Sequence, residues 1–351
     1  YVGETYGFHY GFGLAGIGML SGLLIFWLGR ENYAAAPGLE IREAGLETKW
    51  GMKMYQLITL GSVLLIPLCY VLILKNTFQI GEGDGAFTFP LMTVLLTMLF
   101  VYVAMSLIKA GKAEGAMYRD RMVALVIFMV INVIFWACFE QAGTSLTLFA
   151  DRNVDRMIMG WEMPASMTQF FNPFFIVLFG SIFTWMWVRL DAVGKNPSIP
   201  MKFSLGILQL GLGFLVTIIG LQFVDESTAM VPLLTLLFLY MLHTTGELFL
   251  SPIGLSMVTK LAPKNIAGTA MGGWFLSFAI ANYAGGLIAT LTGGHGGGEI
   301  AAADMTELEM KTAGLSQYID VFSTLGFVLV GFAVLIALMN KPLNKLMHGV
   351  R

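Results

Sequence analysis

The sequence predicts an all-α membrane protein with about nine transmembrane helices. Hydrophobic residues make up 57% of the chain and charged residues only 12%, whereas an ordinary soluble domain carries about 25% charged residues. A soluble chain of this composition would lack polar residues to cover its core. A lipid bilayer removes that problem, because lipid can face apolar side chains. Apolar stretches long enough to cross a bilayer recur along the whole chain.

About nine apolar stretches can span the roughly 30 Å of bilayer hydrocarbon as helices. They cover residues 7–29, 53–75, 88–108, 121–149, 165–188, 202–223, 231–258, 266–292 and 316–339. The connections between them hold nearly all of the charged residues. The pattern therefore predicts a multi-pass protein in contact with membrane lipids.

The basic residues are distributed very unevenly between the two sets of alternate connections. Of the 20 Lys and Arg, only Lys75, Arg152, Arg156 and Lys311 fall in one set, and all the others fall in the opposite set. Cytoplasmic loops are enriched in Lys and Arg, so the C-terminus is predicted to be cytoplasmic. An odd number of spans then places the N-terminus outside. Because the chain also begins at Tyr1 and not at Met, we expect that upstream helices are missing from it.

Composition and motifs argue against several other classes of protein. The net charge of −2 gives no support to a nucleic-acid partner. Cys69 and Cys138 lie inside apolar runs, so no disulfide is expected. HExxH, nucleophile-elbow and Walker motifs do not occur in the sequence. We therefore expect no metal site, no enzymatic activity and no cofactor, with any transport driven by an ion gradient such as that of protons.

Two carboxyl residues inside the predicted spans are the main functional signal. Of the 22 acidic residues, Glu140 and Glu247 lie well inside apolar stretches, where a charge costs about 2.5–3.5 kcal/mol. A fixed ion pair that locks two helices is the structural alternative. No Lys or Arg lies at similar depth in these spans, however, and burial disfavours the charged form of a carboxyl. Glu140 and Glu247 are therefore predicted to be proton-coupling or substrate-binding residues.

Neighbouring residues add polar character to both positions. Trp136 lies one helical turn before Glu140, and His243 lies one turn before Glu247, so each pair shares a helix face. His243 could form a proton relay with Glu247. It could equally form a hydrogen bond to a neighbouring helix.

Proline and tryptophan mark further positions within the predicted spans. Gln169 and Asn172 precede Pro173, and Pro252 follows soon after Glu247. Proline in a membrane helix removes a backbone donor and kinks the helix, which is typical of gating helices, although kinks can also serve packing alone. Trp274 lies in the middle of its span, either as part of the core or as a cavity wall.

Several segments together resemble a known transporter family. The segments FWACFEQAGTSLTLFADRNVD (135–155), QFFNPFFIV (169–177), GELFLSPIGLSMVTKLAP (246–263) and GTAMGGWFLSFAIANYAGG (268–286) resemble the seventh, eighth, tenth and eleventh helices of bacterial proton-dependent oligopeptide transporters (the POT family). The opening segment is similar to the junction between the fifth and sixth helices. The resemblance implies a major-facilitator-type helical bundle, in which residues 1–30 form the last helix of the N-terminal bundle. Residues 31–110 would then form a linker with an inserted helix pair, and residues 111–351 the C-terminal six-helix bundle.

The resemblance also implies roles for individual residues. Glu140 would respond to protonation, and Glu247 would hold the α-amino group of a peptide with the help of Asn172. Trp136 and Trp274 would belong to the peptide pocket. The first-helix ExxER segment and the basic residues of the family's N-terminal bundle do not occur here. The chain is therefore expected to be a partial transporter that needs the missing N-terminal helices of the same protein.

Together, these expectations predict proton-coupled symport of di- and tripeptides by alternating access. The resemblance places it in the bacterial cytoplasmic (inner) membrane. One alternative is a carrier of the same fold for another solute. The other is a membrane receptor or scaffold that transports nothing.

Overall fold

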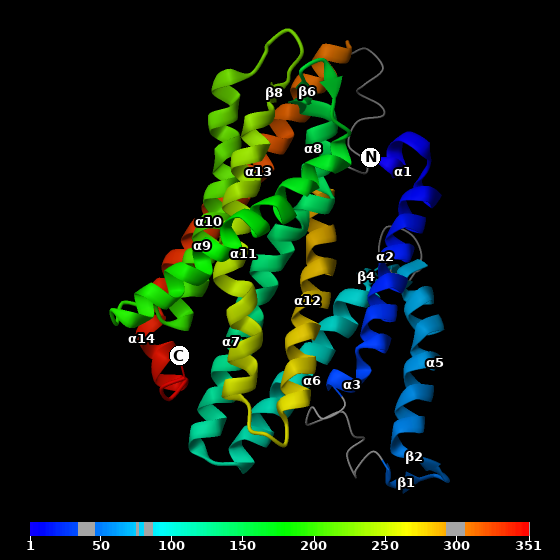
Figure 1. The fold of residues 1–351 in the computed structure, drawn as a ribbon, viewed down its shortest axis with the longest axis vertical. Coiled ribbons are helices and arrows are strands. Elements are labelled where there is room, and N and C mark those ends of the chain that lie inside the picture. Colours follow the sequence, from blue (N-terminus) through cyan, green and yellow to red (C-terminus); the bar gives the residue numbers. More distant parts are fainter. Residues whose placement is uncertain (34–45, 75–76, 81–86, 293–305, 351) are drawn as a thin grey trace. The chain divides into compact units, whose positions relative to one another are not determined.

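The computed structural model of the protein describes all residues except 34–45, 75–76, 81–86, 293–305 and 351 (Figure 1). The chain forms two units, Tyr1–Leu99 and Phe100–Arg351. The all-α prediction is confirmed, because long helices make up both units and the described strands are short. Arg42, Lys75 and Arg351, which contribute to the predicted orientation, lie outside the described residues.

The first unit contains two long apolar helices and the start of a third. Its elements are α1 (Val2–Tyr6), α2 (Phe8–Leu28), α3 (Arg30–Tyr33), β1 (Thr48–Lys49), β2 (Met52–Lys53), α5 (Met54–Leu74), β3 (Thr77–Ile80), β4 (Phe87–Pro90) and the beginning of α6 (Leu91–Ala113). The pairs β1–β2 and β3–β4 are antiparallel. No residue of α2 is buried. Because these side chains are apolar, a helix of this kind needs lipid or other membrane helices around it.

The second unit contains the remaining helices and the hydrophobic core. Its elements are α7 (Ala116–Phe139), the 3₁₀ turn η2 (Glu140–Gly143), α8 (Ser145–Asn153), η3 (Ala165–Phe170), α9 (Phe171–Ala192), α10 (Ile199–Gly220), η4 (Leu221–Phe223), α11 (Leu233–Leu261), α12 (Ala267–Thr290), α13 (Glu307–Leu338) and α14 (Asn340–Leu346). The short strands β5 (Val154–Asp155) and β8 (Val231–Pro232) pair in parallel, and β6 (Met157–Ile158) pairs antiparallel with β7 (Trp161–Glu162). Both pairs lie at the same end of this unit, where the helices are connected (Figure 1).

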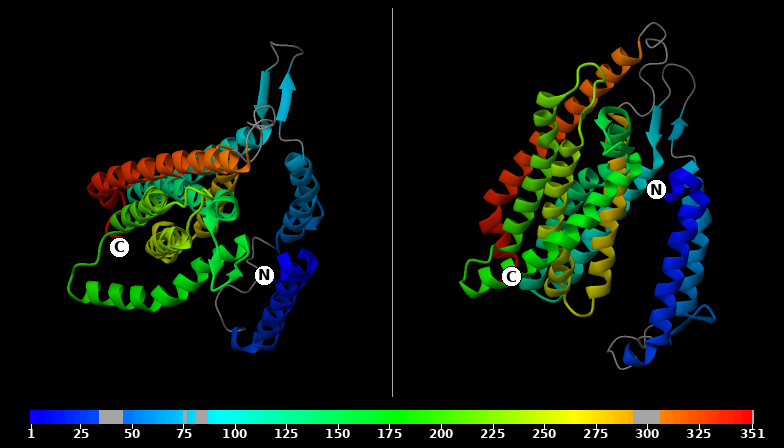
Figure 2. Two further views of the ribbon diagram at one scale, coloured as in Figure 1. Left: turned by 90° about the horizontal axis from the view of Figure 1, so that it is seen from above. Right: turned by 45° about the horizontal axis from the view of Figure 1, so that its top comes forward.

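Close backbone packing holds the centre of the second unit together. α10 packs against both α11 and α13, while α7 packs against α12 and α9 against α11 (Figure 2). A Cβ added at Gly206 of α10 would lie 2.7 Å from the carbonyl oxygen of Gly246, and one added at Gly246 would lie 2.7 Å from that of Gly206. The two helices therefore approach through a reciprocal pair of glycines, the type of contact that small residues permit in membrane helices.

Eight helices in the described part of the chain are long and apolar enough to cross a membrane. The sequence predicts about nine, and the difference concerns residues 266–292. This stretch does form a helix, α12, whose 24 residues extend about 36 Å. Several glycines and the polar side chains of Ser277 and Asn282 lower its mean hydropathy. The helix is therefore long enough to cross a membrane but is less apolar than the eight others.

Two predicted spans are less regular than the sequence indicates. The span predicted at 121–149 is not a single helix, because α7 ends at Phe139 and α8 begins only at Ser145. The backbone of Thr144, with φ −127° and ψ −99°, is not helical. Polar side chains between the two helices satisfy backbone groups that an unbroken helix would pair, which allows the break.

Pro173 does not kink the interior of a helix, contrary to the prediction. The segment 165–170 is a 3₁₀ turn, and α9 begins at Phe171. Pro173 therefore lies in the first turn of α9, where a missing backbone N–H has no helical acceptor to lose. Pro252, in contrast, lies inside α11 as predicted.

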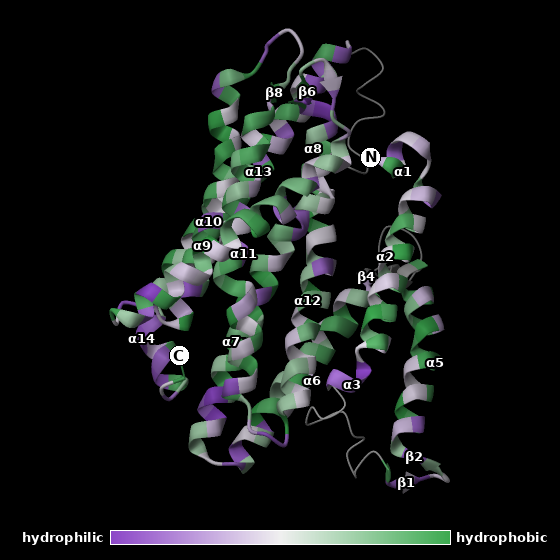
Figure 3. Cartoon of the chain, viewed as in Figure 1, coloured by the Kyte–Doolittle hydropathy of each residue, from purple (hydrophilic) through white to green (hydrophobic). Residues whose placement is uncertain are grey.

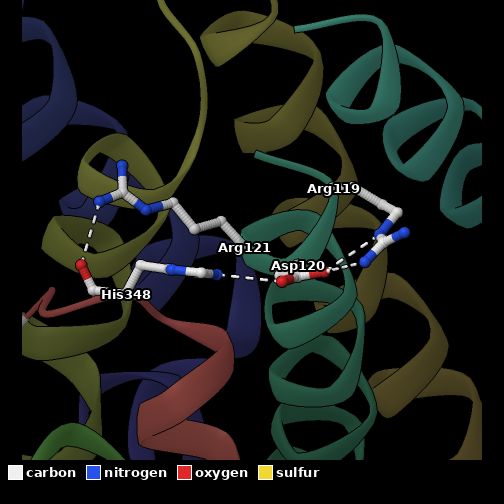
Figure 4. Close-up of polar contacts among 4 residues, drawn as sticks. All are labelled: Arg119, Asp120, Arg121 and His348. Atoms are coloured by element: carbon white, nitrogen blue, oxygen red, sulfur yellow. Dashed lines mark hydrogen bonds and ion pairs between the residues drawn. The ribbon is translucent and has the colours of Figure 1, made fainter. Parts of the chain in front are cut away.

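The charged residues of the second unit gather at the two ends of its helices, and its middle is mostly hydrophobic (Figure 3). At the end that carries the majority of the basic residues, the C-terminal segment is tied to the start of α7 (Figure 4). His348 Nε2 lies 3.0 Å from Asp120 Oδ2, and Arg121 donates to the His348 carbonyl at 3.4 Å. Arg119 pairs with the same Asp120 carboxylate at 2.8 Å.

Candidate functional site

Glu140 lies where the α-helix of its span ends. It is the first residue of η2, directly after the last residue of α7. Its side chain is half-buried, and among the described residues it has no hydrogen-bond or ion-pair partner. A carboxyl group in an apolar span without a partner requires a cavity, a proton or a cation nearby.

A cavity of about 180 Å³ lies beside Glu140. Residues of α7, η2, η3, α9 and α11 surround it. The lining residues are Phe139, Glu140, Ala142, Gly143, Gln169, Asn172, Tyr240 and His243. The cavity therefore lies at the level of the helix breaks, where irregular backbone can face an aqueous space.

Asn172 and Glu247 form the most specific polar contact beside this cavity. Asn172 lies in the first turn of α9, and its Nδ2 donates to Glu247 Oε2 of α11 at 3.0 Å. The same nitrogen lies 3.1 Å from Thr244 Oγ1, and the Thr244 hydroxyl donates to the Tyr240 carbonyl at 2.7 Å. The amide thus holds the Glu247 carboxyl next to Asn172, which lines the cavity, although Glu247 is not itself among the described lining residues.

The two carboxyl groups influence each other. Glu140 and Glu247 lie within electrostatic range, so both cannot be ionised without repulsion unless a proton or a cation lies between them. The structure therefore brings together three of the sequence-predicted site residues, Glu140, Asn172 and Glu247. Their arrangement suits the binding of a proton or of a positively charged group.

The predicted tryptophans lie in aromatic packing next to this site. The Trp136 ring contacts Phe139 and Phe278, with centroids 5.1 and 5.0 Å away. Trp274 is 2% exposed and packs so closely on α11 that a Cβ at Gly254 would lie 2.5 Å from its ring. Neither tryptophan lines the cavity in the described part of the chain, so the structure shows both of them packed between helices.

Gln141 supports the helix break and is a residue whose role the sequence does not reveal. It is fully buried, and its Nε2 donates to the carbonyls of Ala137 at 2.9 Å and of Gly285, on α12, at 3.0 Å. Its Oε1 accepts a hydrogen bond from Ser145 Oγ at 2.7 Å. The Gln141 side chain therefore links the last turn of α7, the first residue of α8 and the backbone of α12 at the break that follows Glu140.

Tyr240 and Gln169 are further residues of the cavity; the sequence marks Gln169 beside Asn172 without a role for it, and no pattern singles out Tyr240. Tyr240 lies one turn before Thr244 on α11, and its hydroxyl approaches the Ala142 carbonyl at 3.5 Å. Gln169 Nε2 donates to Thr147 Oγ1 of α8 at 3.0 Å. The one available signal is spacing, because Tyr240 shares the helix face of His243 and Glu247.

His243 is buried between three helices, with 1% of its surface exposed. The Phe214 ring of α10 lies 4.6 Å away and the Phe139 ring of α7 6.3 Å away, measured between centroids. The backbone of Leu210 approaches the imidazole, but neither ring nitrogen forms a hydrogen bond with any residue that the structure describes. The backbone of Leu210 on α10 is thus the closest approach to the interhelical hydrogen bond considered from sequence.

Comparison with known families and proteins agrees with this picture. The model of the POT family matches residues 1–298. Peptide transporter YePEPT of Yersinia enterocolitica is 33% identical over 358 residues, which cover 99% of this chain and 64% of the relative. Dipeptide and tripeptide permease B of Salmonella typhimurium is 29% identical over 350 residues, or 99% of this chain and 65% of the relative. The chain thus spans somewhat less than two thirds of the length of these relatives.

Solved structures show the same similarity. A crystal structure of peptide transporter POT in complex with sulfate has a TM-score of 0.71 at 28% identity, covering 99% of this chain and 64% of the other. A structure of a mutant of peptide transporter POT in complex with alafosfalin has a TM-score of 0.68 at 26% identity, with coverage of 99% and 64%. The matching proteins are membrane transporters and not enzymes. The fold, the apolar helices and the family match over most of the sequence establish that this chain is a multi-pass membrane protein that belongs to the POT family.

Proposed function

We propose that this chain forms the carboxylate-bearing part of a proton-coupled symporter for di- and tripeptides that works by alternating access. The relatives named as peptide transporter and as dipeptide and tripeptide permease support the substrate class. The remaining part of the site would come from N-terminal helices of the same protein. The driving force would be the proton gradient, with no bound cofactor.

The observation that carries this proposal is the hydrogen bond between Asn172 and Glu247. This bond holds the Glu247 carboxyl next to Asn172, which lines the cavity. Among the described residues, no cationic side chain neutralises this carboxyl. A peptide offers a protonated α-amino group, which is the complementary charge for an oriented carboxylate. Glu247 would hold this amino group with the help of Asn172, and Trp136 and Trp274 would shape the peptide pocket from behind the cavity wall.

Glu140 is proposed to couple proton movement to peptide binding. It lies at the break between α7 and α8, so its protonation acts on a part of the helix that is already discontinuous. When Glu140 is protonated, its repulsion of Glu247 disappears and the site can close around a bound peptide. When Glu140 is ionised, it attracts basic groups, which the missing N-terminal helices would supply.

We further propose the domain organisation and orientation that the sequence indicates. Residues 1–30 would be the last helix of an N-terminal bundle, 31–110 a linker with an inserted helix pair, and 111–351 the C-terminal six-helix bundle. The protein would lie in the bacterial cytoplasmic membrane with its C-terminus in the cytoplasm. The gathering of basic residues at the end of the second unit that contains α14 supports this orientation.

The test uses the complete transporter, meaning this chain together with residues that correspond to the uncovered part of its relatives. It is reconstituted in liposomes, and uptake of labelled dialanine is measured with and without an inward proton gradient. We expect Glu140→Gln to reduce gradient-driven accumulation by roughly 10-fold or more, because the coupling group can no longer exchange a proton. Peptide exchange without a gradient should persist.

Asp320→Asn is the matched control, because Asp320 is exposed on α13 away from the cavity. It should accumulate dialanine like the unaltered protein. Undiminished accumulation by Glu140→Gln at every pH would remove Glu140 from the coupling mechanism. Absence of any peptide uptake by the unaltered transporter would overturn the proposed function itself.

A further inference from the structure

His243 is a buried imidazole without hydrogen bonds at the border of the cavity. Its ring nitrogens Nδ1 and Nε2 are both inaccessible to solvent and unpaired among the described residues. His243 is also one of the residues that line the cavity, together with Glu140 and Asn172. Buried polar side chains in folded proteins are nearly always hydrogen-bonded, so an exception calls for a physical reason.

Packing alone is a poor reason for a histidine at this position. A Cβ at Gly213 of α10 would lie 2.4 Å from His243 Cδ2 and 2.8 Å from Nε2, so the ring fills the space that a glycine leaves. Phe214 and Phe139 border the same space. An apolar side chain would fill it without the cost of burying two unpaired nitrogens. Partners in another state of the protein would offset this cost.

The titratable groups around His243 restrict what those partners are. On α7 and η2 the facing group is the Glu140 carboxyl, which lines the same cavity. On its own helix α11, the facing groups are Tyr240 and Glu247, each about one turn away. α10 presents uncharged neighbours, namely Gly213, Phe214 and the backbone of Leu210, and α9 presents the Asn172 amide. Because Asn172 already holds Glu247, Glu140 is the carboxyl of this site that has no partner among the residues the structure describes.

We propose that His243 is a third proton-binding group of this cavity, and that its imidazolium pairs with Glu140 when the cavity opens to water. The inference rests on the proposed function and deepens it. One proton from water adds to the lone pair of a ring nitrogen, the side chain gains one positive charge, and no other bond changes. The imidazolium neutralises Glu140 and leaves Glu247 for the amino group of the peptide.

This division of roles predicts how substrate binding depends on pH. An ordinary histidine changes its charge between about pH 5 and pH 8. At acidic pH the site then holds one carboxylate for the peptide amine and one that is paired. Near or above neutral pH His243 is uncharged and cannot neutralise Glu140. Glu140 then repels Glu247 whenever no basic group of the N-terminal helices pairs with it, and this repulsion disturbs the peptide site.

The first experiment compares His243→Gln and His243→Phe with the unaltered complete transporter. Dialanine uptake into liposomes is measured at about pH 5.5 and about pH 7.5. We expect the ratio of KM at the higher pH to KM at the lower pH to fall by at least about threefold in both variants, because neither side chain takes up a proton. If His243 only fills space, His243→Phe should retain the original ratio, and that result would overturn the proposal.

The second experiment does not depend on replacing His243. The substitutions His9→Gln, His295→Gln and His348→Gln leave His243 as the one remaining histidine of the chain. With ¹³Cε1-labelled histidine in lipid nanodiscs, we expect the His243 resonance to titrate, and the additional substitution Glu140→Gln to move its titration midpoint. A resonance that does not change between about pH 5 and pH 8 would overturn the proposal.

The two experiments separate this inference from the proposed function. Failure of the unaltered transporter to take up dialanine contradicts peptide symport, whatever His243 does. Peptide uptake with an unchanged KM ratio in His243→Gln contradicts only the role of His243. A midpoint that is insensitive to Glu140→Gln contradicts the ion pair.

Discussion

At the scale of single residues, the site depends on one amide that fixes a carboxyl group. Asn172 Nδ2 contacts both Glu247 Oε2 and Thr244 Oγ1, and the Thr244 hydroxyl is itself bound to the backbone of α11. The carboxyl is thus oriented by a short chain of hydrogen bonds that spans two helices. Orientation before binding reduces the entropy that a ligand must lose to form the same contact.

Replacement of Asn172 by alanine should therefore weaken peptide binding. A hydrogen bond to a charged group contributes about 1.5–3 kcal/mol, so the KM for dialanine should rise roughly 10- to 100-fold in Asn172→Ala. The measurement is gradient-driven uptake by the complete transporter. Asn282→Ala serves as the control, because Asn282 is exposed on α12 and its Nδ2 bonds only the Phe278 carbonyl of its own helix. An unchanged KM in Asn172→Ala would show that the amide does not orient Glu247 for the substrate.

At the scale of elements, the helices are interrupted beside the cavity and tightly packed behind it. η2 breaks the span of Glu140, and η3 precedes the α-helix that carries Asn172. Behind them, the glycine pair of α10 and α11 brings two backbones together, with Gly246 directly before Glu247. Irregular segments of this kind can change conformation locally, whereas tightly packed helices move as a unit.

A methyl group at this glycine contact should destabilise the second unit. In Gly206→Ala the new Cβ would lie 1.9 Å from Leu250 Cδ1 as well as near the Gly246 carbonyl, so α10 and α11 must separate. Overpacking of this kind costs about 1–3 kcal/mol, and we expect a clear fall in the thermal unfolding temperature of the purified protein in detergent. Gly180→Ala is the matched control, since nothing lies within 4 Å of a Cβ at Gly180 of α9. Equal stability of the two variants would contradict the close approach of α10 and α11.

At the scale of the whole molecule, the asymmetry of charge determines how the chain lies in a membrane. The contact of His348 with Asp120 and the hydrogen bond from Arg121 to the His348 carbonyl bring the C-terminal segment to the basic end of the second unit. Lys311 and the salt bridges of Arg156 with Asp151 and Glu162 lie at the other end. Basic residues remain preferentially in the cytoplasm, which supports a cytoplasmic C-terminus.

Labelling of single cysteines checks this orientation. Cys69→Ala and Cys138→Ala remove the two native thiols, and Lys345→Cys or Thr312→Cys then introduces one exposed thiol at each end. In right-side-out membrane vesicles, a membrane-impermeant maleimide should label Thr312→Cys. Lys345→Cys should react only after the vesicles are opened. The reverse pattern would show that the C-terminus lies outside.

The sequence by itself determined the class of the protein, the approximate position of each apolar helix and the two carboxyl residues at issue. These features are local or compositional, because a bilayer imposes helices of a certain length and makes a charged residue inside them costly. The family resemblance was equally readable from short segments, and the match to the POT family confirms it.

Only the tertiary structure decided how these residues meet. The end of α7 at Phe139, the place of Pro173 in the first turn of α9 and the support from Gln141 all depend on hydrogen bonds with other helices or turns. No spacing in the sequence reveals that Asn172 reaches Glu247, or that His243 lies unpaired against Gly213. Contacts between residues far apart in the chain depend on how the folded helices pack against one another, and no single segment of the sequence determines that packing.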